Sequence, residues 1–393
     1  MKKKFFALMI ISAFSLNAGV GASFAALAET KTVGLAKQTS ELAAQLPASD
    51  AVMTLNVGRL YSDALPLVLS GNQPLLAEIT GKIDEFKTKT GFDLRQFEQI
   101  AIGVSSRKNG SNLTFEPVLL ARGSFNANAL LALGKTAANG KYREEKSGDR
   151  TIYIFSPQQL MQSSPKSTSS AKNTPPATLK ALPPPKPMAT TAIKIKTPSP
   201  FERAIERMFD SLSREVAVTA FSDNTLAIGS LARVREAVGA TSLKIDDDVL
   251  NLVTRRANAV LNIGLKLPNG IADFAPDLGN DEISKNINAI RYLSGSLDAG
   301  DGSATLSVLA KTSLPEQAKS IFEQLQGFQM LGKSFLGSGG KSEDKQVFSR
   351  MIDNVKIARG DGSNEVTLDL QVPQNDINIL LKPKKPADKN PSK

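Results

Sequence analysis

The chain has 393 residues, of which 41% are hydrophobic and 22% charged, a composition typical of a globular protein with room for two domains. It contains no Cys, His or Trp. These absences exclude disulfide bonds, zinc sites built from Cys or His, thiol catalysis and Ser-His-Asp triads.

The net charge of +10 is concentrated at the N-terminus, in residues 157–200 and in the tail 382–393. The rest of the chain is close to neutral, whereas binding to a phosphate backbone needs a basic face on the fold itself. We therefore expect no nucleic-acid partner. The lysine-rich segments are expected to solubilise the chain; contact with an anionic membrane or wall polymer is the alternative.

Residues 1–28 are predicted to be an export signal. Three lysines at positions 2–4 precede the apolar run 5–16, and Ala26-Leu27-Ala28 matches the pattern that signal peptidase accepts. No other apolar run reaches the roughly 18 residues of a membrane-spanning helix. We expect a soluble mature protein, periplasmic or extracellular, that begins with an N-terminal segment at 29–45.

Residues 46–240 are predicted to form a first α+β unit. Alternating and helical apolar spacing predicts strands at 51–57, 99–104, 115–121, 151–155, 216–221 and 225–229, and helices at 72–90, 126–138, 201–212 and 230–239. The segment 157–200 holds ten of the 21 prolines, and we expect it to be a disordered insert inside this unit.

Residues 241–381 are predicted to form a second unit with a similar order of elements, followed by a disordered basic tail at 382–393. Its strands are expected at 259–265, 289–297, 304–310, 354–358 and 366–372, and its main helix at 315–335. The predicted fold is α+β, with two related units of antiparallel sheet and helices packed on one face. The units could share one continuous sheet or move independently.

Two sequence motifs match catalytic patterns in letters only. Gly327–Ser334 fits the phosphate-loop spacing, but it continues a helix with bulky apolar residues instead of following a strand. Ser105–Lys108, Ser222–Asn224 and Lys89–Gly91 match the three motifs of penicillin-recognising serine enzymes, but in the wrong chain order. We interpret all four segments as structural.

Paired carboxylates remain as candidates for hydrolysis or calcium binding. Glu144-Glu145 and Asp246-Asp247-Asp248 are the clearest groups. Both neighbour turn-like residues, and the second lacks the glycine and distal Glu of an EF-hand loop, so we interpret them as solvated surface charge. The sequence thus predicts no catalytic, cofactor-binding or metal-binding residue and no cofactor.

Part of the first unit resembles uncharacterised exported bacterial proteins of acidobacterial type, a repeat family of unknown function. The likeness lies in Leu46–Val52, Asp93–Gly103, Arg143–Glu145 and Arg150–Tyr153. The resemblance implies export and a repeat architecture, and it implies no activity.

The sequence favours an exported, non-catalytic protein that binds a protein, a peptide or a component of the cell envelope. The alternatives are an exported hydrolase that uses carboxylates and a structural spacer of the envelope. Several acidic residues converging in one concave pocket would favour the hydrolase, and the absence of such a cluster would favour binding.

Overall fold

The computed structural model describes residues 39–109, 112–157, 200–239, 244–267, 281–337 and 342–382. The predicted export signal, nearly all of the predicted insert and the tail after Lys382 lie outside the described residues. Helices and one large antiparallel sheet make up the described part, so the predicted α+β class is confirmed.

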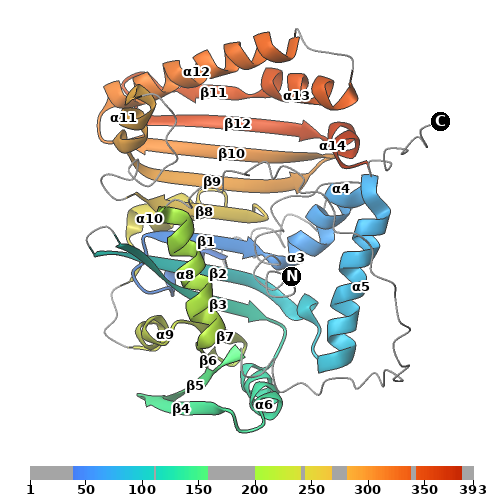
Figure 1. Cartoon of the computed structure of the whole chain (residues 1–393), viewed down its shortest axis with the longest axis vertical. Helices are drawn as coiled ribbons and strands as arrows, with labels where there is room; N and C mark the ends of the chain where they lie inside the picture. The colour runs from blue at the N-terminus through green and yellow to red at the C-terminus, as the bar shows by residue number, and fades with distance from the viewer. Residues whose placement is uncertain are drawn as a thin grey trace, which may run out of the picture.

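The sheet has 12 strands in the spatial order β11-β12-β10-β9-β8-β1-β2-β3-β7-β6-β5-β4, from top to bottom in Figure 1. Their bounds are β1 Ala51–Asn56, β2 Phe97–Asn109, β3 Asn112–Gly123, β4 Tyr142–Ser147, β5 Arg150–Phe155, β6 Val216–Ser222, β7 Thr225–Gly229, β8 Leu261–Lys266, β9 Ile290–Gly300, β10 Ser303–Thr312, β11 Lys356–Arg359 and β12 Glu365–Pro373. Hairpin turns set much of the register. The β9–β10 turn, for example, uses Asp301 and Gly302 at φ 50° and 67°, the left-handed values that a two-residue hairpin requires.

Two runs of strands meet at the centre of the sheet. β1 pairs with β8 in antiparallel register, with Thr54 opposite Asn262. On one side β1, β2 and β3 follow in chain order and β7 comes next; on the other, β8, β9 and β10 are followed by β12. The two halves therefore share one continuous sheet. That they are copies of one unit stays a prediction.

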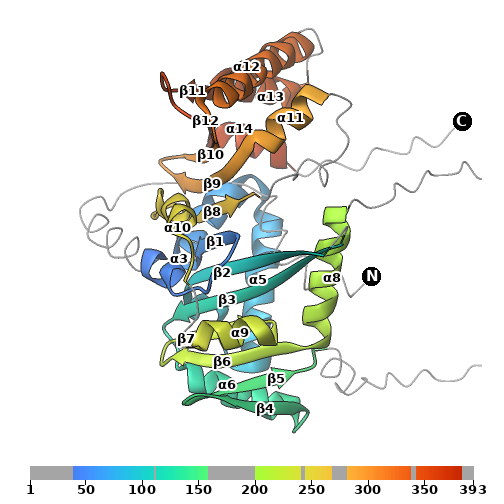
Figure 2. The same ribbon diagram turned by 90° about the vertical axis from the view of Figure 1, so that its left-hand side faces the viewer.

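Helices surround the sheet at both ends and on its faces (Figures 1 and 2). Their bounds are α3 Val57–Arg59, α4 Leu65–Leu69, α5 Gln73–Thr90, α6 Ala127–Ala138, α8 Pro200–Arg214, α9 Leu231–Val238, α10 Asp247–Thr254, α11 Asp281–Ala289, α12 Pro315–Gly337, α13 Glu343–Asn354 and α14 Gln374–Leu381. A π-helical turn at Leu60–Ala64 and 3₁₀ turns at Ser70–Asn72 and Leu94–Gln96 complete the order.

The helices pack on both faces of the sheet, which corrects the expectation of one face. Because side chains alternate along a strand, Ala227 and Leu226 of β7 point to opposite faces. Ala227 belongs to a core with α9, α10 and the helical residues 39–44, whereas Leu226 packs against α6. We name the two faces after neighbouring residues of β1: the Thr54 face, with α9 and α10, and the Leu55 face, with the π-helical turn, α4, α6 and α12. Both faces carry apolar side chains, so both need cover.

Candidate functional site

The motifs that match catalytic patterns occupy structural positions. Gly327–Ser334 lies inside α12 and so cannot present free backbone N–H groups to a phosphate. Ser105 lies on β2 instead of at a helix start, and Lys89-Thr90-Gly91 is the end of α5, where Gly91 adopts φ 74° as the C-cap. Ser222–Asn224 spans the end of β6 and the turn to β7.

The acidic candidates form ion pairs with separate partners. On the edge strand β4, Glu144 pairs with Lys135 at 3.1 Å and Glu145 accepts two hydrogen bonds of 2.6 Å from Arg235. The hydrogen bond from Arg235 lowers the pKa of the Glu145 carboxyl. Of the residues that the structure describes, no three acidic groups gather as a metal site would require.

The three consecutive aspartates begin α10. Asp246 is the N-cap, accepting a hydrogen bond of 2.9 Å from the Asp248 backbone N–H, and it pairs with Lys266 at 2.8 Å. The hydrogen bond from Lys266 lowers the pKa of Asp246. Asp248 accepts a hydrogen bond from the Tyr292 hydroxyl at 3.1 Å. These carboxylates therefore position the helix on the sheet.

A row of polar side chains crosses the Thr54 face perpendicular to the strands. The register places Thr54, Asn262, Ser296, Ser307 and Asp369 directly opposite one another on β1, β8, β9, β10 and β12. We call these five residues the polar ladder. Four of them are almost fully buried, from 1% exposed for Thr54 to 9% for Ser307.

The C-terminal end of α10 rises beside the ladder and encloses a small pocket. The pocket has a volume of about 180 Å³, and we call it the polar pocket. Its exposed lining is about equally polar and apolar. Leu252 and Leu309 supply the principal apolar side chains, and the polar ones are Arg255, Arg256, Asn262, Ser294, Ser296, Ser307, Thr367 and Asp369. Arg255 and Arg256 form its cationic wall, and ladder residues form its floor.

Local sequence explains why α10 lies close enough to build this wall. Gly264 of β8 lies beneath α10, where a Cβ atom would come within 2.9 Å of the Val249 carbonyl oxygen. Val249 and Val253 are fully buried against the sheet. The buried side of α10 faces the sheet, and the helix ends with Arg255 as its C-cap. A cation at this position interacts favourably with the helix dipole.

The pocket holds two ion pairs and one buried donor without an acceptor. Arg256 pairs with Asp369 at 3.1 Å, and Arg255 pairs with Glu365 at 3.3 Å. Asp369 also accepts a short hydrogen bond from the Ser307 hydroxyl. Asn262 is 2% exposed, and its Nδ2 finds no hydrogen-bond partner among the described residues. A buried amide left unpaired is costly.

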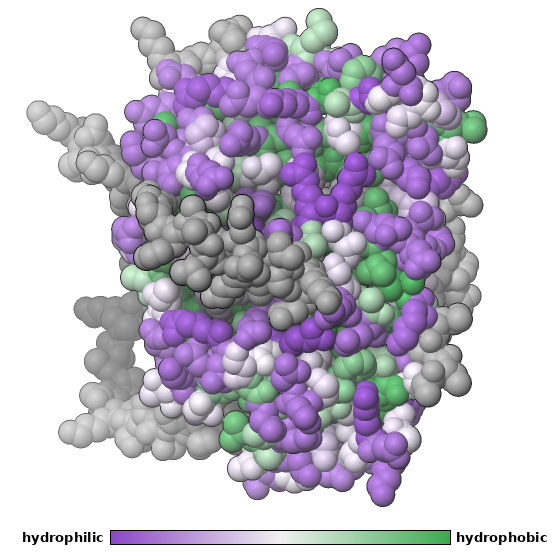
Figure 3. Space-filling model, turned by 180° about the vertical axis from the view of Figure 1, so that it is seen from behind, coloured by the Kyte–Doolittle hydropathy of each residue, from purple (hydrophilic) through white to green (hydrophobic). Residues whose placement is uncertain are grey.

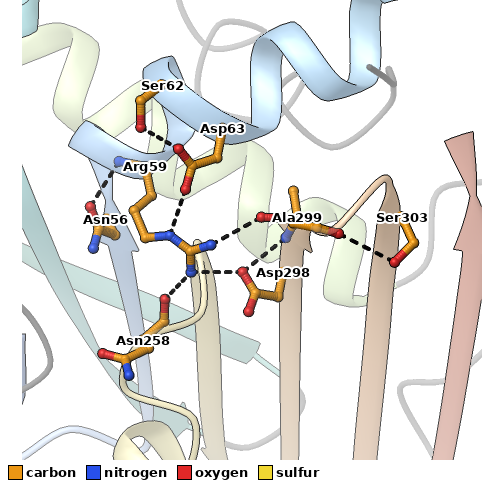
Figure 4. Close-up of polar contacts among 9 residues, drawn as sticks. Asn56, Arg59, Ser62, Asp63, Asn258, Asp298, Ala299 and Ser303 are labelled. Atoms are coloured by element: carbon orange, nitrogen blue, oxygen red, sulfur yellow. Dashed lines mark hydrogen bonds and ion pairs between the residues drawn. The ribbon is translucent and has the colours of Figure 1, made fainter. Parts of the chain in front are cut away.

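A second polar cluster joins the two halves of the sheet (Figure 4). Arg59 donates from Nε to Asp63 at 2.8 Å, from Nη1 to Asp298 at 2.8 Å and to the Asn258 carbonyl, and from Nη2 to the Ala299 carbonyl at 3.0 Å. Burial alone would lower the pKa of Arg59, but hydrogen bonds and charge attraction from Asp63 and Asp298 raise it. Four of the five guanidinium N–H donors are engaged in these bonds, so this cluster is a structural joint.

The sequence prediction named no site residue and so missed the polar pocket. One signal was present: Ser294, Ser296 and Ser307 recur at alternate positions of adjacent strands in the second half. That spacing predicts hydroxyl groups on one face of the sheet. The contribution of α10 was not visible, because no helix was predicted at 247–254.

The molecular surface seen from behind is mostly hydrophilic, with apolar residues in scattered patches (Figure 3). Within the described ranges, no helix has both the length and the apolar character needed to cross a bilayer.

Comparison with known proteins gives no family. No family model and no curated protein matches the chain. Among solved structures, crystal forms I, III and IV of TP0453 are similar at 9%, 9% and 10% identity, with TM-scores of 0.35, 0.37 and 0.38. They cover 87%, 87% and 89% of this chain and 96%, 97% and 100% of those chains. TM-scores this low carry no inference about function.

Proposed function

We propose that this chain is an exported, non-catalytic binding protein whose ligand site is the polar pocket. The observation that carries the proposal is the pocket itself: a concave site with two arginines on one side and serine hydroxyls among its lining residues. Convergent polar groups in a concavity are the usual mark of a small-molecule site.

The same residues argue against the hydrolase. Glycoside hydrolysis needs two carboxyl groups that face each other across the scissile bond. Asp369 is the one acidic residue in the pocket lining, and it is already engaged by Ser307 and Arg256. The Ser307–Asp369 hydrogen bond is the feature of this pocket that a hydrolytic alternative would use, since it places a hydroxyl beside a carboxylate. Ser62, Ser106 and Ser124 donate to carboxylates in the same way, so such a bond does not by itself indicate a catalytic pair.

The edges of the sheet do not favour peptide binding by strand addition. β4 has the sequence Tyr-Arg-Glu-Glu-Lys-Ser, and β11 has only four residues. Charged or very short edge strands are the features by which natural sheets avoid pairing with other chains. A ligand held within the sheet surface is therefore favoured over a peptide or protein at its edge.

The test is ligand screening of residues 29–393 against small carboxylates, amino acids, sugars and phosphate esters. Ligand-observed NMR would detect binding, and mass spectrometry of the same mixtures after incubation would detect conversion. We expect binding without conversion, and loss of binding in Arg256→Gln. Turnover that disappears in Ser307→Ala or Asp369→Asn would overturn the non-catalytic assignment.

A further inference from the structure

We infer that the polar pocket selects a small organic carboxylate, an inference that rests on the proposed function. Several polar groups of the pocket already form hydrogen bonds within the protein. The Ser294 hydroxyl donates to the Leu252 carbonyl at 3.1 Å, and the Ser307 hydroxyl donates to Asp369. The Asp369 oxygen that accepts from Ser307 also accepts from Arg256. Both bonds reach Oδ1, and the ion pair with Arg256 offsets the charge of Asp369, which makes the pocket less favourable for a cationic ligand.

The unused capacity lies with the two arginines. Each guanidinium has five N–H donors, and each forms a single ion-pair contact, at 3.3 Å for Arg255 and 3.1 Å for Arg256. About half of each side chain is exposed. The planar fork of a guanidinium matches the two oxygens of a carboxylate, and such paired bonds are stronger than single ones.

Asn262 lies at the floor of the pocket but offers no donor to a ligand. Its Nδ2 atom is buried beside the Ser296 position of the ladder and is closed to solvent. A molecule in the pocket therefore does not contact this atom, and the choice of ligand rests on the two arginines.

The volume of the polar pocket and the charges around it restrict the class of ligand further. A volume of about 180 Å³ is many times the roughly 10–15 Å³ that one water molecule requires, so the pocket has room for an acid of a few carbon atoms. Leu252 and Leu309 provide apolar contacts for its hydrocarbon part. The charges of Arg255 and Arg256 are balanced by Glu365 and Asp369, so a monoanion is better matched than doubly charged phosphate.

The test compares butanoate, butanamide and inorganic phosphate at equal ionic strength, by isothermal titration with residues 29–393. Butanamide keeps the shape of butanoate without its charge. We expect butanoate to bind at least about tenfold more tightly than butanamide, the difference typical of charge-assisted hydrogen bonds. Equal affinity for the two compounds, tighter binding of phosphate, or no binding of butanoate would overturn the carboxylate assignment.

Two variants separate ligand binding from structural damage. Arg256→Gln should weaken butanoate binding at least about tenfold, whereas Arg95→Gln, an exposed arginine on the 3₁₀ turn before β2, should leave it unchanged.

The screening panel distinguishes failure of the ligand class from failure of the proposed function. If a neutral or cationic compound binds and Arg256→Gln abolishes its binding, the carboxylate assignment is wrong and the binding function stands. If no compound of the panel binds to the folded protein, both are wrong.

Discussion

Because Gly264 has no side chain, α10 can lie close enough to the sheet to form one side of the polar pocket. The glycine lies on the Thr54 face of β8, directly below α10, and a Cβ there would lie 2.9 Å from the Val249 carbonyl oxygen and 3.2 Å from the Val253 backbone nitrogen. These contacts are with backbone atoms, which cannot rotate away. The helix can therefore approach the sheet, and carry its arginines to the polar pocket, only if residue 264 has no side chain.

We expect Gly264→Ala to lower the free energy of unfolding by about 1–3 kcal/mol, because the added methyl group overpacks the helix–sheet contact. Urea unfolding followed by circular dichroism would measure the change. Gly295→Ala is the matched control: this glycine lies on the adjacent strand, its added Cβ meets no atom within 4 Å, and the change should be within about 0.5 kcal/mol. Equal losses in both variants would refute the packing explanation.

At the level of elements, α10 depends on the charge at its N-terminus. Asp246 caps the helix and pairs with Lys266 on β8, so one carboxylate links the helix end to the sheet. Its pKa is lowered in the folded protein, first by the hydrogen bond from Lys266. The unfolded chain therefore binds the proton more readily, and stability increases with pH across this interval. The contribution is complete above the ordinary pKa of 3.8 and is lost as pH falls through the lowered value.

Asp246→Asn keeps an oxygen that can cap the helix but removes the charge. We expect a loss of about 0.5–1 kcal/mol at pH 7, because the ion pair is partly exposed, and a loss that shrinks as pH falls below the ordinary pKa of 3.8. Urea unfolding at a series of pH values would measure this. Asp247→Asn, in the same turn, should show a smaller loss at pH 7. A loss for Asp246→Asn that is the same at pH 3 and pH 7 would contradict the role of the charge.

The sequence predicted elements well where apolar periodicity was strong and flanked by turn residues. The predicted helices at 72–90, 126–138 and 230–239 correspond to α5, α6 and α9, and Ser230 caps α9 as expected. The missed elements have weaker signals: β4 is almost entirely polar, and α13 begins within a charged segment. α10 was missed because its aspartates were interpreted as surface charge instead of a helix start.

The polar pocket could not have been predicted from local pattern. Its floor depends on the register of β8, β9, β10 and β12, and its wall on a helix packed across them. Alternation fixes which face a residue occupies, but it does not fix which residue of a distant strand lies opposite. Asn262 and Asp369 become neighbours of one pocket only through β9 and β10.

For the whole molecule, the joint between halves is a second determinant of stability beside the sheet itself. Arg59 follows β1 and contacts residues that precede β8 and end β9 (Figure 4). Its side chain is 17% exposed, so its bonds are shielded from water more than those of a surface ion pair.

We expect Arg59→Ala to reduce the free energy of unfolding by about 2–4 kcal/mol, since it leaves Asp298 and two carbonyl groups without their donor. Arg95→Ala, which removes a more exposed arginine from its ion pairs, should cost about 0.5 kcal/mol or less. Differential scanning calorimetry of both variants would test the comparison. A loss for Arg59→Ala no larger than for Arg95→Ala would show that the joint is unimportant.

The predicted export signal at residues 1–28 can be tested directly. If residues 1–28 are a cleaved signal, the mature protein should begin at Glu29. N-terminal sequencing of protein recovered from the periplasm or medium of an expressing bacterium would establish this. Replacing Ala26 and Ala28 with larger residues should leave the uncleaved form; secretion of uncleaved original chain would contradict the assignment.

The central β1–β8 pairing also affects the order in which the sheet can form during synthesis. β1 is made early, but its partner in the middle of the sheet follows more than half a chain length later. A growing chain that has reached only β7 carries β1 with one row of backbone N–H and C=O groups unpaired, in the state of an unprotected edge strand. Until β8 emerges, the incomplete chain is open to mispairing along the free side of β1.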